Sequence, residues 1–245
     1  SGYQLASNKL EAHVTGAGNV DLNELDAVEL VDVDTANGSI SITSGETMTA
    51  TDVQSLTDGN DITLTATNGD LIAGTVNAQA SGDVTMDATN GSIKGDGDSD
   101  TRITANEVIL TAVNGIDGDG LNTAVDTIDA QVSAVGDINI NELDQVELRN
   151  VSTANGSIDV TSGGTMTVTN VVSSTDSDDN DVNLKATTGD LVFNDITVGA
   201  SADISLEATE GNIVKAPGKT LVADTVSLTA GQNIGSSALD GQINT

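Results

Sequence analysis

The densest group of chemically active side chains in the sequence is an acidic loop. Asp96, Asp98 and Asp100 place carboxylates at alternate positions, and Glu107 is the twelfth residue counted from Asp96. A hard cation such as calcium prefers several oxygen ligands gathered on one flexible turn, as in an EF-hand loop. The spacing therefore predicts a calcium site. Thr101 stands where an EF-hand loop has glycine, and no flanking helices are expected, so a solvated acidic loop between strands is the alternative.

Two other acidic segments, residues 117–119 and 176–180, repeat this pattern in weaker form. Calcium is the only cofactor that the sequence suggests.

The types of residue present give little indication of catalysis. His13 is the only histidine, and the equivalent position in the internal repeat described below is Gln131. Arg102 and Arg149 are isolated cations, and abundant aspartates make carboxylate pairs uninformative. We therefore expect no enzymatic activity, and we expect His13 to be an ordinary exposed residue.

Charge and composition exclude several classes of partner. The net charge is −31 with only seven Lys and Arg, which argues against nucleic acid and against anionic membrane surfaces. No apolar run approaches the ~20 residues that span a bilayer, so no membrane insertion is expected. There are no cysteines, which excludes disulfides.

The core must be built without aromatic side chains, because Tyr3 and Phe193 are the only two aromatic residues. Small aliphatic residues fill a core evenly only on a regular scaffold. Twenty-six glycines and one proline indicate many tight turns.

A long internal repeat organises the chain. Residues 18–26 match residues 136–144, and residues 35–40 match residues 153–158, at an offset of 118. The offset becomes 120 after residue 60 and returns to 118 near Val226. The chain therefore contains two tandem blocks, about residues 6–123 and 124–245, within one continuous domain spanning residues 1–245.

A shorter repeat of 20–24 residues lies inside each block. Each unit begins with two aliphatic residues that flank one polar residue, and a second short strand follows an Asn-Gly or similar turn, where positive φ is expected. This alternation is typical of β-strands. The spacing from Val108 to Ile138 is 30 residues, which predicts a looped-out or extra segment near residues 115–126. The unit-initial pairs are Val20/Leu22, Ile40/Ile42, Ile62/Leu64, Val84/Met86, Val108/Leu110, Ile138/Ile140, Ile158/Val160, Val182/Leu184, Ile204/Leu206 and Val226/Leu228.

A coil that repeats at this length stacks the same residue type above itself at the inter-strand spacing of ~4.8 Å. We therefore predict an all-β fold, a single-stranded parallel β-helix (β-solenoid) of about 20–24 residues per coil. A leucine-rich repeat lacks support because no helical half is visible. An antiparallel sandwich usually has an aromatic-rich core.

The units resemble the repeats of filamentous-haemagglutinin-like exoproteins of two-partner secretion and of related autotransporter passengers. The resemblance covers about residues 10–235 and is carried by segments 63–71 (TLTATNGDL), 109–116 (ILTAVNGI) and 227–235 (SLTAGQNIG). It implies a right-handed β-helix at a bacterial cell surface or in the extracellular medium. The secretion domain of that family is not visible in the sequence.

Two functions are consistent with these features. The first is a non-enzymatic structural or adhesive rod, a stalk that contacts a host or neighbouring cell. The second is a self-assembling subunit that stacks end to end with copies of itself into an extracellular filament or surface layer, because uncapped coil ends expose strand edges.

Overall fold

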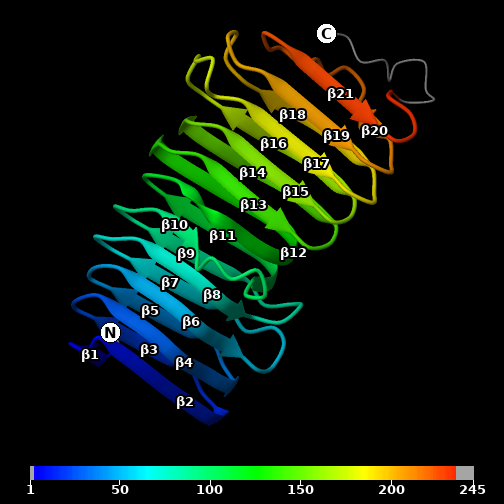
Figure 1. Cartoon of the computed structure of the whole chain (residues 1–245). Coiled ribbons are helices and arrows are strands. Elements are labelled where there is room, and N and C mark those ends of the chain that lie inside the picture. The colour runs from blue at the N-terminus through cyan, green and yellow to red at the C-terminus, as the bar shows by residue number, and fades with distance from the viewer. Residues whose placement is uncertain (1–2, 236–245) are drawn as a thin grey trace.

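The structure, a computed structural model, describes residues 3–235, with side chains described at all of these except 118–120. It is an all-β solenoid of about ten turns without any helix in the described range, which confirms the predicted fold class (Figure 1). Among these residues no helix is long and apolar enough to cross a membrane. The strands are β1 (Tyr3–Leu5), β2 (Lys9–Ala17), β3 (Val20–Glu24), β4 (Val28–Asn37), β5 (Ile40–Ser44), β6 (Met48–Ser55), β7 (Ile62–Ala66), β8 (Leu71–Asn77), β9 (Val84–Ala88), β10 (Ile93–Gly95), β11 (Ile103–Ala112), β12 (Ile116–Val135), β13 (Ile138–Glu142), β14 (Val146–Asn155), β15 (Ile158–Ser162), β16 (Met166–Ser173), β17 (Val182–Ala186), β18 (Leu191–Thr197), β19 (Ile204–Ala208), β20 (Ile213–Lys215) and β21 (Val226–Ala230).

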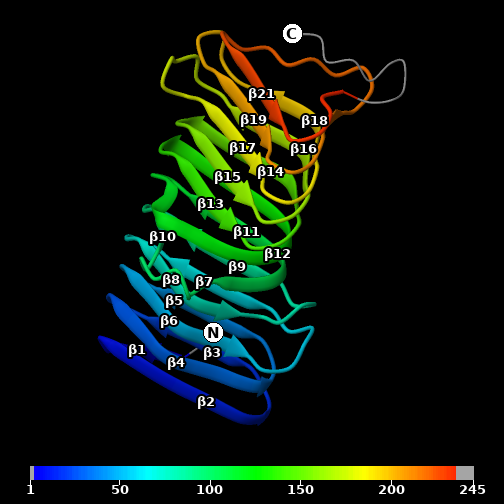
Figure 2. The ribbon, with the colours of Figure 1, turned by 45° about the vertical axis from the view of Figure 1, so that its right-hand side comes forward.

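Each coil has three sides. In the coil that starts at Ile40, the first side is β5, and β6 supplies the second side, residues 48–50, and the third, residues 53–55. The alternation of buried and exposed residues shifts at residues 51–52, where the chain turns a corner between two sides. The strands pair with strands of the coil above or below, and these pairings are parallel, as in β6 with β8. Figure 2 shows the coils stacked along one axis.

The core is one continuous cluster of aliphatic side chains that runs through the described coils. Columns of equivalent residues fill it, because parallel register places each inward-facing residue over its counterpart. One column contains Val28, Met48, Leu71, Ile93, Ile116, Ile138, Ile158, Val182, Ile204 and Val226.

Positive φ, expected at the Asn-Gly corners, is found at Gly115 of Asn114-Gly115 (φ 138°) but not at the other Asn-Gly corners. None of Gly38, Gly69 and Gly91 is among the residues with positive φ. Glycine is needed there because the coils approach too closely for a side chain. A Cβ on Gly38 would lie 2.0 Å from the carbonyl oxygen of Gly18, in the coil below.

Many aspartates at the corners are structural acceptors. The Asp61 Oδ1 atom accepts a hydrogen bond from the backbone N–H of Asp83 at 3.1 Å, one coil further along. Asp181 and Asp203 repeat this contact in the second block, at 2.9 Å. Part of the negative charge therefore connects successive coils, since these carboxylates satisfy backbone donors that the strands leave free.

The two sequence blocks are not stacked in phase. The column above Val20 reaches Ile128 after five coils, whereas the sequence equivalent of Val20 is Ile138. Ile138 pairs with Ile116, so it belongs to the second-side column of the first block. The block repeat of 118 residues therefore spans five coils plus one side, and equivalent strands of the two blocks lie on different sides of the solenoid. The first-side column contains Val20, Ile40, Ile62, Val84, Val108 and Ile128.

The extra residues between Val108 and Ile138 produce this shift. The expectation that these residues are looped out of the solenoid is wrong. They form β12, whose 20 residues cover the second side and third side of one coil and the first side of the next. The extra segment is thus part of the solenoid wall.

Candidate functional site

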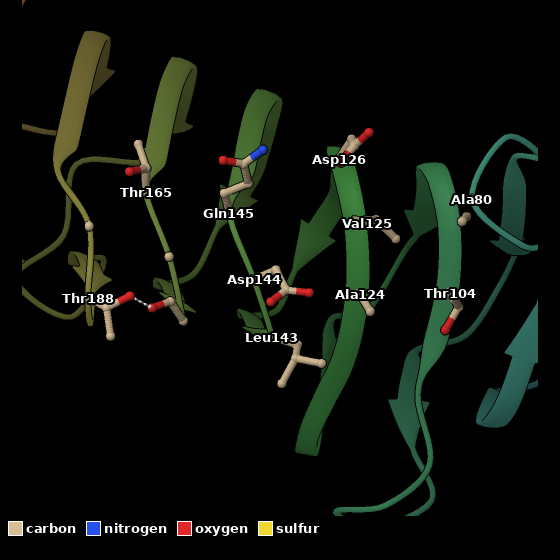
Figure 3. Close-up of a pocket in the computed structure, with 14 residues that line it drawn as sticks. Ala80, Thr104, Ala124, Val125, Asp126, Leu143, Asp144, Gln145, Thr165 and Thr188 are labelled. Atoms are coloured by element: carbon tan, nitrogen blue, oxygen red, sulfur yellow. Dashed lines mark hydrogen bonds between the residues drawn. The ribbon is translucent and has the colours of Figure 1, made fainter.

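A groove crosses the wall where the first block meets the second. Its volume is about 940 Å³, and it extends across several coils. Figure 3 shows residues 124–126 of β12 on one side and the turn containing Leu143 and Asp144 facing them. Further along the axis, Thr188 lines the groove and donates a hydrogen bond from Oγ1 to the Gly163 carbonyl oxygen at 2.7 Å.

The groove follows from the shift between the blocks. Residues 124 and 125 pair with β11 in the coil below. Their upper edge has no ladder partner, because the pairing of β12 with β13 ends at Thr123 and the pairing with β14 resumes at Thr127. A turn, residues 143–145, lies above them in place of a strand. A short open strand edge therefore borders a concave surface in the middle of the solenoid.

Glu142 closes part of this edge from inside. The residue is buried, and its Oε2 atom accepts hydrogen bonds from Val125 N at 3.1 Å and Thr123 Oγ1 at 2.7 Å. Its Oε1 atom accepts from Asp144 N at 3.0 Å. Burial raises the pKa of Glu142, although these hydrogen bonds oppose the shift. The carboxylate thus replaces ladder bonds that the turn cannot make.

Glu24 performs the same task in the first block. It is also buried, and its Oε2 atom accepts from Ser7 N at 3.0 Å. Ser7 and Val125 are equivalent positions, so the sequence repeat encodes this contact twice. The signal was present in the repeated Asn-Glu-Leu-Asp segments, where a glutamate follows an inward-facing aliphatic residue at two-residue spacing.

The acidic loop predicted to bind calcium connects β10 to β11. Asp96 Oδ1 accepts from Asp98 N at 3.0 Å and from Thr101 Oγ1 at 2.6 Å, and Asp98 Oδ1 accepts from Asp100 N at 2.9 Å. The loop is therefore held by its own Asp side chains. Within the described residues, the carboxylate oxygens of Asp96, Asp98 and Asp100 do not all lie within 4.8 Å of one another.

Glu107 forms its ion pair with a residue outside that loop. It is on β11, and its Oε1 atom forms an ion pair with Arg149 Nη1 at 2.7 Å. Arg149 also contacts Asp129 Oδ2 at 3.2 Å. Calcium binding by Asp96, Asp98, Asp100 and Glu107 stays a prediction, and a melting temperature that does not change between millimolar calcium and chelator would contradict it.

The two weaker acidic segments have different positions. Residues 176–180 form the loop between β16 and β17, where Asp176 Oδ1 accepts from Ser201 N at 2.8 Å. In the other segment, the side chain of Asp119 lies outside the described part of the structure.

His13 is the residue whose surroundings the sequence reasoning missed. Its Nδ1 atom lies 2.6 Å from Asp34 Oδ2, across two neighbouring strands. In the sequence, residues 11–13 and residues 32–34 each carry charged or ionisable side chains at alternate positions. This pattern predicts a contact only when the strand register that pairs the two segments is known.

Comparisons of the chain with protein-family models, curated proteins and solved structures gave no significant match. The β-helical repeat architecture therefore rests on the structure itself. The likeness to filamentous-haemagglutinin-like exoproteins rests on the sequence motifs alone.

Proposed function

We propose that this chain is a non-enzymatic extracellular rod with a structural or adhesive role, similar in use to the stalks of filamentous-haemagglutinin-like exoproteins. The observation that carries the proposal is the continuous aliphatic core, which runs through about ten stacked coils and ties them into one body. Because each coil touches only its neighbours, such a stack projects its ends and faces at fixed positions. The acidic exterior keeps copies apart at low ionic strength and suits a solvent-exposed location.

The groove where the first block meets the second is the surface that we assign to adhesive contact. Its walls carry Asp126, Asp144 and Gln145, and the exposed Leu143 lies beside them. These exposed polar and apolar side chains, gathered at a concave surface, offer contacts to a partner surface.

Cell binding tests the adhesive role. The fluorescently labelled chain should bind cultured epithelial cells saturably in flow cytometry. Gln145→Trp, which fills the groove from an exposed position, should reduce binding, whereas Asp21→Asn, remote from the groove, should not. Binding no greater than that of labelled albumin, another acidic protein, would contradict the adhesive role.

A second candidate function is end-to-end self-assembly, and a strand pairing inside the chain favours it. β21 is the sequence equivalent of residues 108–112, and β2 is the equivalent of residues 127–135. Inside the chain, residues 108–112 pair in parallel with residues 128–132. The contact between β21 of one copy and β2 of the next would therefore repeat a pairing that the molecule already makes.

Electron microscopy of the 245-residue chain at rising salt concentration separates the two candidates. Fibres of uniform width that appear as salt screens the like charges would support self-assembly. Rods of monomer length at every salt concentration would contradict it and leave the stalk role in place. Leu10 packs against the end of the core at the β2 edge, so Leu10→Asp should abolish fibres, and circular dichroism should show whether the monomer keeps its fold.

A further inference from the structure

Three side chains converge on the outer surface of the first coils. His13 is on β2, and Asp32 and Asp34 are on β4, the strand directly above it. The register pairs Glu11 with Asp32 and His13 with Asp34. One ligand atom from each of His13, Asp32 and Asp34 lies within 4.8 Å of the other two.

The types of these residues indicate which ion would fit. An imidazole nitrogen and two carboxylate oxygens match zinc and related divalent transition metals, whereas calcium prefers oxygen ligands alone. We propose that His13, Asp32 and Asp34 form a surface site for a zinc-type divalent metal ion, with three protein ligands and a solvent-facing fourth position.

The geometry requires little rearrangement. The Nδ1 atom of His13 and the Oδ2 atom of Asp34 are 2.6 Å apart as a hydrogen-bonded pair. Two ligands of a tetrahedral zinc with bonds of ~2 Å lie roughly 3.3 Å apart, so side-chain rotation can open the pair enough to admit the ion. All three side chains are on paired strands, so the backbone positions are fixed by the ladder.

The local charge also favours a cation. Asp34 forms a hydrogen bond with His13, and Asp32 and Glu11 stand close enough to act on it electrostatically.

The second block holds the same backbone arrangement without the ligands. Asp129 pairs with Asn150, and Gln131 pairs with Ser152, in the register of the first block. Arg149 adds a guanidinium beside Asp129 at 3.2 Å. The second block is therefore an internal control in which the strand geometry is present and the metal ligands are absent.

Zinc titration of the tag-free chain tests the proposal. Isothermal titration calorimetry should show one site, and His13→Gln and Asp34→Ser, which install the residues of the second block, should each weaken zinc binding by at least about tenfold. Asp96→Asn, in the acidic loop, should leave the affinity unchanged. Because His13 is the only histidine, the imidazole nitrogen resonances of the chain report on it alone and should shift on zinc addition. No binding, or binding that survives His13→Gln unchanged, would overturn the proposal.

A gain-of-site variant gives an independent arm. Gln131→His, Asn150→Asp and Ser152→Asp, together with Arg149→Val, should raise the stoichiometry to two zinc ions per chain. If the stoichiometry stays at one while circular dichroism shows a native fold, the strand register does not position these ligands and the proposal fails.

Discussion

The two blocks share their coil geometry but differ in what they place on it. β4 and β14 have the same length and nearly the same burial pattern, although they lie on different sides of the solenoid. The surfaces have diverged: the first block carries His13 and the acidic loop, and the second carries Arg149. A coil is therefore specified locally, by inward aliphatic residues and corner glycines, whereas its phase along the axis is set elsewhere.

The cores of the blocks also differ at one column. The first block stacks Ala50 and Ala73 in positions where the second block stacks Val168 and Phe193. Phe193 is fully buried and is the largest of the fully buried side chains. The column above it ends on Lys215, whose Nζ atom donates to the Lys219 carbonyl oxygen at 2.6 Å.

The largest expected effect comes from that difference. Phe193→Ala should lower the free energy of unfolding by about 3–5 kcal/mol, because it leaves a cavity in a rigid stack. Its counterpart Ala73→Gly should cost only about 1 kcal/mol. Thermal unfolding followed by circular dichroism measures both. Equal costs would mean that the two cores are packed alike.

The sequence predicted the coils well because their determinants are local. The paired aliphatic residues of each unit, such as Ile62 and Leu64, all lie on strands with inward-facing side chains. The sequence could not predict the offset between the blocks, since the equivalence of Val20 and Ile138 in the repeat fixes their local conformation but not which column each joins. The repeated Asn-Glu-Leu-Asp segments mark Glu24 and Glu142 in the sequence, but the backbone N–H groups that these carboxylates bind become known only from the stacking of the coils.

The next largest effect on stability is expected from substitutions at two equivalent glycines. A Cβ on Gly136 would lie 2.2 Å from the carbonyl oxygen of Asn114, whereas a Cβ on Gly18 would meet, among the described residues, a Val14 methyl alone, at 3.3 Å. Gly136→Ala should therefore destabilise the fold by about 3 kcal/mol, and Gly18→Ala should stay within about 0.5 kcal/mol. Similar melting temperatures for the two variants would show that the junction is not closely stacked.

Glu142→Gln should cost about 2 kcal/mol, because the amide turns an NH₂ group toward an N–H donor. The folded pKa of Glu142 is raised, so its contribution to stability is fullest below the ordinary glutamate pKa and is lost as the pH rises through the raised value. The stability gap between wild type and Glu142→Gln should therefore narrow from about pH 4 to about pH 7. A gap that widens over this range, in denaturant titrations at both pH values, would contradict the sign.

The smallest effect concerns the exposed ion pairs of the second block. Arg149→Val, which installs the residue found at position 31, removes contacts with Glu107 and Asp129. Because these contacts are partly exposed, the loss should be at most about 1 kcal/mol and should shrink in high salt. A loss that is independent of salt would mean that the arginine stabilises by packing.

The offset between the blocks is tested most directly by a distance between two spin labels. The chain has no cysteine, so Glu29→Cys with Asn139→Cys, and Asp21→Cys with Asn139→Cys, give clean label pairs. Glu29 and Asn139 follow Val28 and Ile138, which are five steps apart in one column, so their labels should be separated by about 24 Å. The labels at Asp21 and Asn139, on different sides, should be clearly further apart. The reverse order, with the shorter distance between positions 21 and 139, would show that the blocks stack in phase and would contradict the account.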